Sequence, residues 1–368
     1  MINKERLLST FLDYVRIDSE SKHEGAIAAR IAADMEAIGC QIYVDNSGEK
    51  TGSETGNLYC TLPATGEGEP IILSAHMDTV VPGIGVEPVV EDGIVRSKGE
   101  TVLGSDDKSG VVAIVEAMRT IAEKNIPHPT IQAVFTTCEE IGLLGSGALE
   151  FDKLAGKKAL ILDSGGQAGL INTQAPGQYK IFATIVGRRA HAGGAPELGI
   201  SAIQVAAEAI ANMKLLRIDE ETTANIGSIV SDFPTNIVPE RLELIAEARS
   251  RNAEKLETQV KHMMDCLQNA CDKYGATLES RLVKLYEAYC FPSDDPFIQE
   301  VSDVCRKQGF EPVLAASGGG SDANILNANG FQALVLGTGM DKVHTIEEQI
   351  AVKDLENTAA LVLALCTK

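Results

Sequence analysis

The sequence is poor in positive charge. Its 368 residues include 32 lysines and arginines against 52 aspartates and glutamates, which gives a formal net charge of −20. Nucleic acids and anionic membranes bind proteins through clustered lysines and arginines, and a strongly acidic surface is repelled by both. We therefore expect neither nucleic acid nor a membrane among the partners.

Long apolar runs and paired cysteines are also lacking. No stretch approaches the roughly 18 consecutive apolar residues that a transmembrane helix needs. The N-terminal segment carries an acid at Glu5 and has no uninterrupted apolar run, so we expect no signal peptide. The 8 cysteines include no Cys-x-x-Cys pair, and most lie among apolar neighbours, as reduced core cysteines do. These features predict a cytoplasmic protein.

Hydrophobic residues make up 44% of the chain, which is enough for a sizeable core in about two domains. In residues 1–177 and again in 289–368, strand-like and helix-like segments alternate, which predicts an α/β fold with a mostly parallel, helix-covered sheet. Residues 178–288 instead follow the order β-α-β-β-α-β of a ferredoxin-like sandwich. We predict one catalytic domain, 1–177 plus 289–368, interrupted by an inserted second domain.

The apolar run that begins at Ile71 ends in two residues that can bind a metal, His76 and Asp78. Residues two apart on a strand point to the same face, so the imidazole and the carboxylate emerge side by side. At the carboxyl end of a buried strand, α/β folds place their chemistry. Taken alone, the pair is better explained by a core histidine beside a hydrogen-bonding aspartate, but the acids in the rest of the chain change this balance.

Further acids and a second histidine follow other predicted strands or begin a helix: Asp106, Glu139, Glu140, Asp163 and His344. For Asp106 the simpler interpretation is a helix cap. Collected at one sheet edge, so many carboxylates repel each other unless cations neutralise them. Two imidazoles with several carboxylates suit Zn²⁺, Co²⁺ or Mn²⁺ and are too rich in nitrogen for Ca²⁺ or Mg²⁺. Adjacent glutamates on an extended chain point apart, so one can bind a cation while the other faces the attacking water.

These motifs together resemble the dinuclear zinc peptidases that include tripeptidase T, glutamate carboxypeptidase, acetylornithine deacetylase and succinyl-diaminopimelate desuccinylase. The matching segments are Ser74-Ala75-His76-Met77-Asp78-Thr79, Ser105-Asp106-Asp107-Lys108, Thr137-Cys138-Glu139-Glu140-Ile141-Gly142, Asp163-Ser164-Gly165 and Val343-His344-Thr345. They come in the family's order, and tripeptidase T-like proteins are the most similar. The resemblance implies a zinc aminopeptidase-like sheet with a lid domain and hydrolysis of short peptides.

The resemblance also implies a role for each residue of the site. His76, Asp106 and Asp163 would hold one zinc ion, and Asp106, Glu140 and His344 the other, with Asp106 shared. Asp78 would orient His76 through its carboxylate. Glu139 would be the general base. Two zinc ions are thus the expected cofactors, and cobalt or manganese can substitute.

In the inserted domain, His191 matches the family's lid histidine, which stabilises the oxyanion, often from the partner subunit of a dimer. Asn236 and Arg249 resemble the lid's substrate contacts, and Gly319 and Gly320 resemble a loop on the substrate side. The simpler interpretations are a surface histidine, a turn asparagine, a solvated arginine and a tight turn. We expect a homodimer formed through the inserted domain.

Two departures bear on the substrate. Tripeptidase T has an arginine where this chain has Gly318, and a proline where it has Ala192. A carboxypeptidase or a deacylase of N-acyl amino acids therefore stays open beside the tripeptidase-like aminopeptidase. The non-enzymatic alternative is an inactive binding homologue, which the complete set of ligands and the base Glu139 disfavour.

Overall fold

The computed structural model describes residues 1–367, which form two compact units. The first unit comprises residues 1–173, 291–317 and the chain from Ser321 onward, and the second comprises residues 174–290 and 318–320. The assignment of these parts of the sequence to a catalytic domain and a lid stays a prediction. No helix within residues 1–367 has the length and apolar character needed to cross a membrane.

The main sheet has nine strands, and it is parallel at its centre and antiparallel at its edges. Its order is β1-β2-β6-β3-β7-β18-β8-β16, with β17 paired to β8. Strand β3 pairs in parallel with β6 and β7, and β18 in parallel with β7. The antiparallel edges refine the expectation of a mostly parallel sheet. Its strands are β1 (Gln41–Val44), β2 (Leu58–Leu62), β3 (Ile71–His76), β6 (Ile131–Thr136), β7 (Lys158–Ile161), β8 (Leu170–Ala175), β16 (Tyr289–Cys290), β17 (Val313–Ala316) and β18 (Gln332–Leu336).

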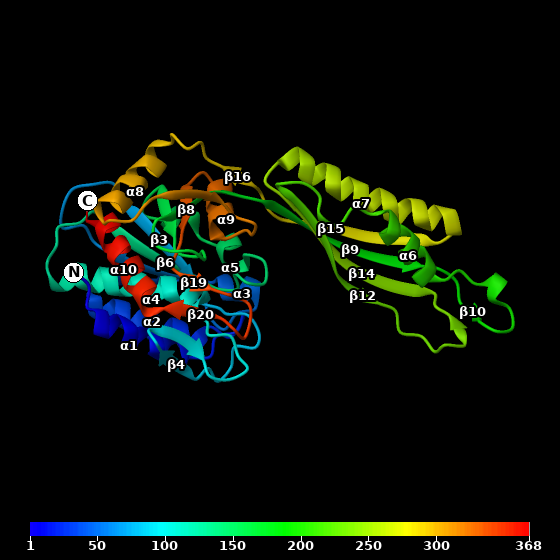
Figure 1. Ribbon diagram of the computed structural model, residues 1–368, viewed down its shortest axis with the longest axis horizontal. Coiled ribbons are helices and arrows are strands. Elements are labelled where there is room, and N and C mark those ends of the chain that lie inside the picture. The colour runs from blue at the N-terminus through cyan, green and yellow to red at the C-terminus, as the bar shows by residue number, and fades with distance from the viewer. Residues whose placement is uncertain (368) are drawn as a thin grey trace. The chain divides into compact units, whose positions relative to one another are not determined.

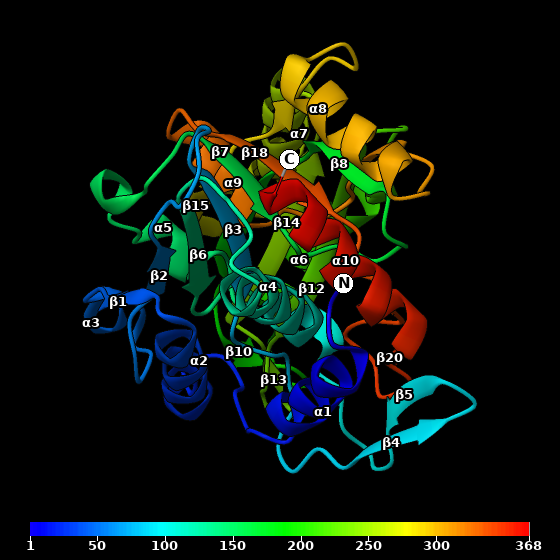
Figure 2. The ribbon, with the colours of Figure 1, turned by 90° about the vertical axis from the view of Figure 1, so that its left-hand side faces the viewer.

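The central strands are buried along their whole length because helices cover them. Every residue of β3 and β6 is buried, as the continuous apolar runs of parallel strands require. Helix α4 lies on β3 and is itself contacted by α1, α2 and α10 (Figure 2). The helices of this unit are α1 (Lys4–Val15), α2 (Gly25–Ile38), α3 (Ser47–Thr51), α4 (Ser105–Glu123), α5 (Leu144–Gly147), the 3₁₀ turn η1 (Phe151–Lys153), α8 (Pro296–Lys307), α9 (Asp322–Ala328) and α10 (Val352–Cys366).

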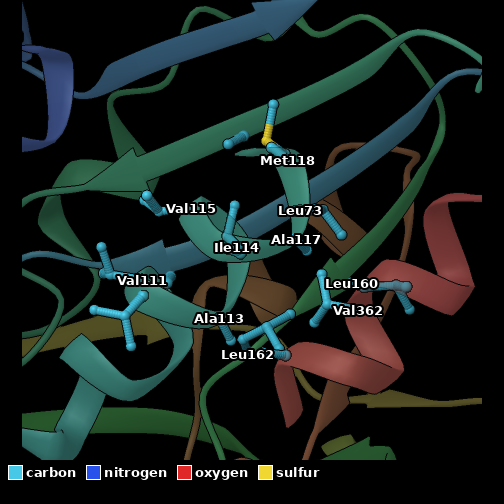
Figure 3. Close-up of a cluster of buried hydrophobic side chains, with 14 of the residues drawn as sticks. Leu73, Val111, Ala113, Ile114, Val115, Ala117, Met118, Leu160, Leu162 and Val362 are labelled. Carbon is cyan, nitrogen blue, oxygen red and sulfur yellow. The ribbon is translucent and has the colours of Figure 1, made fainter. Parts of the chain in front are cut away.

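The core of the first unit lies where α4 meets the sheet and α10. Figure 3 shows Leu73 of β3 and Leu160 of β7 beside the α4 side chains, with Val362 of α10 next to them. At roughly 1.5–3 kcal/mol for each large apolar side chain removed from water, this cluster fixes α4 on the sheet. The position of α4 matters for the site because Asp106 lies in its first turn.

A small antiparallel sheet lies in the same unit, with the order β19-β20-β5-β4. It contains β4 (Pro88–Glu91), β5 (Ile94–Ser97), β19 (Met340–Asp341) and β20 (Gln349–Ala351). The loop between β19 and β20 carries His344. This sheet therefore decides where the second histidine is held.

The second unit is an antiparallel sheet with two helices on one face (Figure 1). Its sheet order is β11-β12-β14-β9-β15, and β9, α6, β12, β14, α7 and β15 follow the expected β-α-β-β-α-β order. The elements are β9 (Gly177–Val186), β10 (Ala190–His191), the 3₁₀ turn η2 (Pro196–Leu198), α6 (Ala202–Asn212), β11 (Leu216–Arg217), β12 (Thr222–Val230), β13 (Ile237–Val238), β14 (Arg241–Ser250), α7 (Ala253–Tyr274) and β15 (Thr277–Tyr286).

Candidate metal centre and active site

Strand direction brings the first residues of the site together. His76 is the last residue of β3, and Asp163 follows β7 by two residues. The adjacent Glu139 and Glu140 follow the end of β6. Because β3, β6 and β7 are parallel neighbours, their carboxyl ends meet at one edge of the sheet.

Asp106 lies between the two histidines. Its Oδ1 is 3.1 Å from His76 Nε2, and its Oδ2 is 3.1 Å from His344 Nε2. The residue has non-helical dihedral angles, φ −85° and ψ 103°, although it falls within the bounds of α4. Its backbone therefore departs from the helix, and its side chain presents one oxygen to each imidazole. A carboxylate in this position can be a ligand that two cations share.

His344 also faces Glu140, whose Oε1 is 3.0 Å from His344 Nε2. On the other side, Asp163 Oδ1 is 3.9 Å from His76 Nε2. The structure thus gathers the other four predicted metal ligands around Asp106. His344 has a φ of 62°, an uncommon conformation for a residue other than glycine.

Among residues 1–367, two sets of side chains bring their ligand atoms within 4.8 Å of one another inside each set. One set is His76, Asp106 and Glu140, and the other is His76, Asp107 and Asp163. Asp107 was not predicted to be a ligand. Its Oδ2 accepts a hydrogen bond from the His76 backbone N–H at 3.3 Å, and its Oδ1 accepts one from Gly110 N–H at 3.2 Å. Both oxygens are thus engaged with the backbone, whereas those of Asp106 face imidazole nitrogens.

The electrostatics fit bound cations. Burial raises the pKa of Glu139, Glu140 and Asp163, and nearby carboxylates raise each of them further. Hydrogen bonds with Asp106 and Glu140 raise the pKa of His344 to about 10. Protons therefore occupy part of the site when nothing else neutralises its acids. The imidazole and carboxylate donors are those that zinc, cobalt and manganese prefer, so the residues present fit two such ions.

Asp78 lies beside His76, the residue that it was predicted to orient, and it also has other partners. The nearest acceptor to His76 Nδ1 is the backbone carbonyl of Asp78, at 2.9 Å, while the Asp78 carboxylate is 3.6 Å away. That carboxylate instead accepts hydrogen bonds from the backbone N–H groups of Glu139 and Glu140, at 2.9 and 3.2 Å, and from the Ser21 hydroxyl at 2.6 Å. The Asp78 carboxylate therefore orients Glu139 and Glu140 at least as directly as it orients His76.

Two further buried carboxylates support the site and were missed in the sequence. Glu24 accepts hydrogen bonds from the backbone N–H groups of Cys138, at 2.9 Å, and Lys22, at 3.0 Å. Glu348 accepts four hydrogen bonds from residues 103–106. Their positions in the sequence do not indicate this role, because Glu24 precedes a helix as capping acids do and Glu348 follows an exposed glutamate.

The predicted substrate residues form two separate groups in the second unit. His191 of β10 pairs with Ile237 of β13, next to Asn236, and both His191 and Asn236 are exposed. The His191 Nδ1 accepts hydrogen bonds from the N–H groups of Gly193 and Gly194, at 3.1 and 2.9 Å, and Nε2 takes no part in these two bonds.

Arg249 lies on β14, and a side chain added at Gly319 would come within 3.8 Å of its guanidinium. Its Nε and Nη2 donate to the two carboxylate oxygens of Glu247, at 2.9 and 3.0 Å. A side chain at Gly320 would overlap the ring of Tyr286, so any other residue there would require Tyr286 to move. The predicted carboxylate clamp is thus paired with an acid of its own strand.

Comparison with known proteins decides the family. A profile of peptidase family M20/M25/M40 matches residues 72–368, which is most of the chain. The chain belongs to this family. A solved structure described as aminopeptidase PepT from Bacillus cereus is 42% identical, with a TM-score of 0.91 and coverage of 100% of this chain and 98% of the other. A tripeptidase from Staphylococcus aureus is 38% identical, with a TM-score of 0.95 and the same coverage.

Among curated proteins, the uncharacterized protein YqjE of Bacillus subtilis is 41% identical over 365 residues, covering 99% of this chain and 98% of the relative. Peptidase T of Clostridium botulinum is 26% identical over 98% of both chains. These relatives confirm the predicted α/β peptidase fold and the resemblance to tripeptidase T. The M20 chain is therefore a hydrolase of peptide bonds, and the family is metal-dependent.

Proposed function

We propose that this M20 chain is a two-cation aminopeptidase that removes residues from short peptides, tripeptides above all. The observation that supports this most is the position of Asp106, whose two oxygens each lie 3.1 Å from a different imidazole. One carboxylate shared by two histidine-containing ligand sets is the arrangement that a two-metal hydrolase needs. The solved relatives described as an aminopeptidase and a tripeptidase indicate the substrate class.

In this proposal His76, Asp106 and Asp163 hold one cation, and Asp106, Glu140 and His344 hold the other. Two divalent ions held by these residues would activate a water molecule and polarise the scissile carbonyl. Glu139 would accept a proton from the attacking water and give it to the leaving amine. Burial raises the pKa of Glu139, which suits a group that must both accept and release a proton near neutral pH.

Glu139 and Glu140 divide these tasks because of how their turn is held. The Glu140 carboxylate faces His344 at 3.0 Å, whereas Glu139 belongs to neither group of clustered ligand atoms. Asp78 holds the N–H groups of both residues, so the turn cannot rotate to exchange the two side chains without breaking these bonds.

We propose zinc as the native metal, because two imidazoles in a carboxylate site favour it over magnesium and calcium. Elemental analysis of protein purified without chelators should give about two zinc ions per chain. One ion or none, after addition of zinc and removal of the excess, would count against this site.

The substrate assay is a panel of tripeptides, dipeptides, peptides with blocked N- or C-termini and N-acyl amino acids. An aminopeptidase should lose activity when the substrate's amino group is blocked and keep it when the carboxyl group is amidated. The opposite pattern, or turnover of acylated amino acids alone, would favour the carboxypeptidase or deacylase instead.

We further propose that the second unit is the lid and dimerises the protein, and that His191 completes a site by contacting the substrate's oxyanion. Exposed apolar side chains on this unit, including Leu198, Ile203 and Ile229, support an interface there. Light scattering at micromolar concentration should give twice the 39.1 kDa of one chain. We also keep the cytoplasmic location as a prediction, which cell fractionation tests.

A further inference from the structure

Glu348 is a buried acid whose carboxylate accepts hydrogen bonds from one short segment of the chain. Its Oε2 accepts hydrogen bonds from the N–H groups of Leu103 and Gly104, at 2.8 and 2.9 Å. Its Oε1 accepts from the Ser105 hydroxyl at 2.6 Å and from the Asp106 N–H at 3.0 Å. A carboxylate offers about four acceptor positions, so this segment occupies them all.

The segment that Glu348 binds ends at the shared ligand Asp106, and Glu348 itself lies in the loop that carries His344. The Glu348 N–H donates to the Thr345 carbonyl at 3.1 Å, which closes the loop on the residue after His344. One side chain thus connects two segments more than 240 residues apart, at the point where His344 Nε2 lies 3.1 Å from Asp106 Oδ2.

Residues 103–106 need the Glu348 carboxylate because their backbone N–H groups have no acceptor within the helix. Gly104 has a φ of 76°, and Asp106 has non-helical dihedral angles, so the N–H groups from Leu103 to Asp106 point outside the helix ladder. The ammonium of Lys108 is buried nearby in the same helix and attracts the Glu348 carboxylate. A neutral side chain at position 348 would lose both the four charge-assisted hydrogen bonds and this attraction.

We propose that Glu348 is a positioning residue that sets the distance between Asp106 and His344 and thereby the affinity of the cation that these two residues and Glu140 hold. This inference rests on the two-cation function proposed above. Residues that orient metal ligands without touching the metal typically change metal affinity by about 10–100-fold. The other cation depends less on Glu348, because His76 and Asp163 lie at the ends of β3 and β7.

The test compares Glu348→Gln with Glu347→Gln. The glutamine at 348 keeps the length of the side chain but presents an NH₂ donor to backbone donors. The matched control makes the same change one residue earlier, where the exposed Glu347 pairs with Lys342 at 2.9 Å. Metal-free proteins are titrated with Co²⁺ against a competing chelator while the cobalt absorption band is recorded. We expect Glu348→Gln to bind one of two ions about 10–100-fold more weakly, with an altered band, and Glu347→Gln to match the wild type.

Ser105→Ala keeps the test decisive if Glu348→Gln does not fold. It removes one of the four donors, and we expect the same ion to bind about fivefold more weakly, the value of one hydrogen bond. If variants of Ser105 and Glu348 bind both ions with wild-type affinity and spectrum while melting at a lower temperature, Glu348 only stabilises the fold and the inference is overturned. A wild type that binds fewer than two ions would instead overturn the proposed function, and this inference with it.

Discussion

Two sets of carboxylates in the first unit, one at the metal centre and one that supports it, have different hydrogen-bond partners. The supporting acids Glu24, Asp78 and Glu348 accept hydrogen bonds from backbone N–H groups of the segments that carry the site. The inner acids face imidazoles and one another, and burial raises the pKa of Glu139, Glu140 and Asp163. Acids already satisfied by the backbone can only hold the chain in place, whereas the inner acids still need a proton or a cation.

The largest expected effect is a difference in activity and metal content between variants of the neighbouring acids Glu139 and Glu140. Glu139→Gln keeps its size but cannot take a proton, so kcat should fall about 10²–10⁴-fold while the metal content stays at two ions. Glu140→Gln should lose one ion, and excess zinc should restore part of its activity. Steady-state kinetics and elemental analysis of both variants check this. If Glu139→Gln loses the ion and Glu140→Gln keeps it, the two roles must be exchanged.

Metal removal should destabilise the protein, because the inner acids lose their neutralising charge. With free zinc at about a hundredfold its dissociation constant, the folded state gains about 2.7 kcal/mol per site. Urea unfolding with zinc and with chelator measures the difference. Asp106→Asn serves as the control, since a variant without the shared ligand should show little of this gain. Equal unfolding free energies for the wild type under both conditions would mean that the inner acids do not bind the metal.

In the metal-free protein, neutralising one acid of each set should have unequal effects. Glu24→Gln removes the charge that binds the Cys138 and Lys22 N–H groups and should lower the free energy of unfolding by about 1–3 kcal/mol. Asp163→Asn relieves repulsion among the inner acids, so it should leave stability unchanged or raise it slightly. Chelator-treated samples in urea provide the measurement. Equal destabilisation by both substitutions would remove the distinction between supporting and inner acids.

The smallest effect concerns pH. Hydrogen bonds with Asp106 and Glu140 raise the pKa of His344 to about 10, so the metal-free site holds this proton at neutral pH. A cation needs the neutral imidazole, and binding must therefore release the proton. Acid favours the metal-free state, and affinity should rise about tenfold per pH unit for each proton released, until the pH reaches about 10. Chelator competition at several pH values measures the slope, and His191→Ala, which changes an exposed histidine, should leave it unaltered. A dissociation constant independent of pH would contradict the protonated His344.

Much of the fold follows from local pattern. The bounds of α7 (Ala253–Tyr274) follow from local signals, because Asn252 caps its N-terminus and Gly275 ends it in the left-handed conformation. The order of elements in the second unit was also predicted, since its strands and helices differ clearly in hydrophobic period. The two-residue strands β10 and β13 were missed, because so short a pair has no period to detect.

The sequence by itself determined which side chains could form the metal centre, because histidines and acids at the ends of buried strands are visible as a pattern. Only the tertiary structure decided how the remaining acids act. The Asp78 carboxylate holds the Glu139–Glu140 turn, Glu24 holds Cys138, and Glu348 binds the segment before Asp106 across more than 240 residues. Every residue except proline has a backbone N–H group, so the sequence does not show which N–H group an acid will bind. The packing of β3, β6 and α4 and the loop between β19 and β20 determine these pairs.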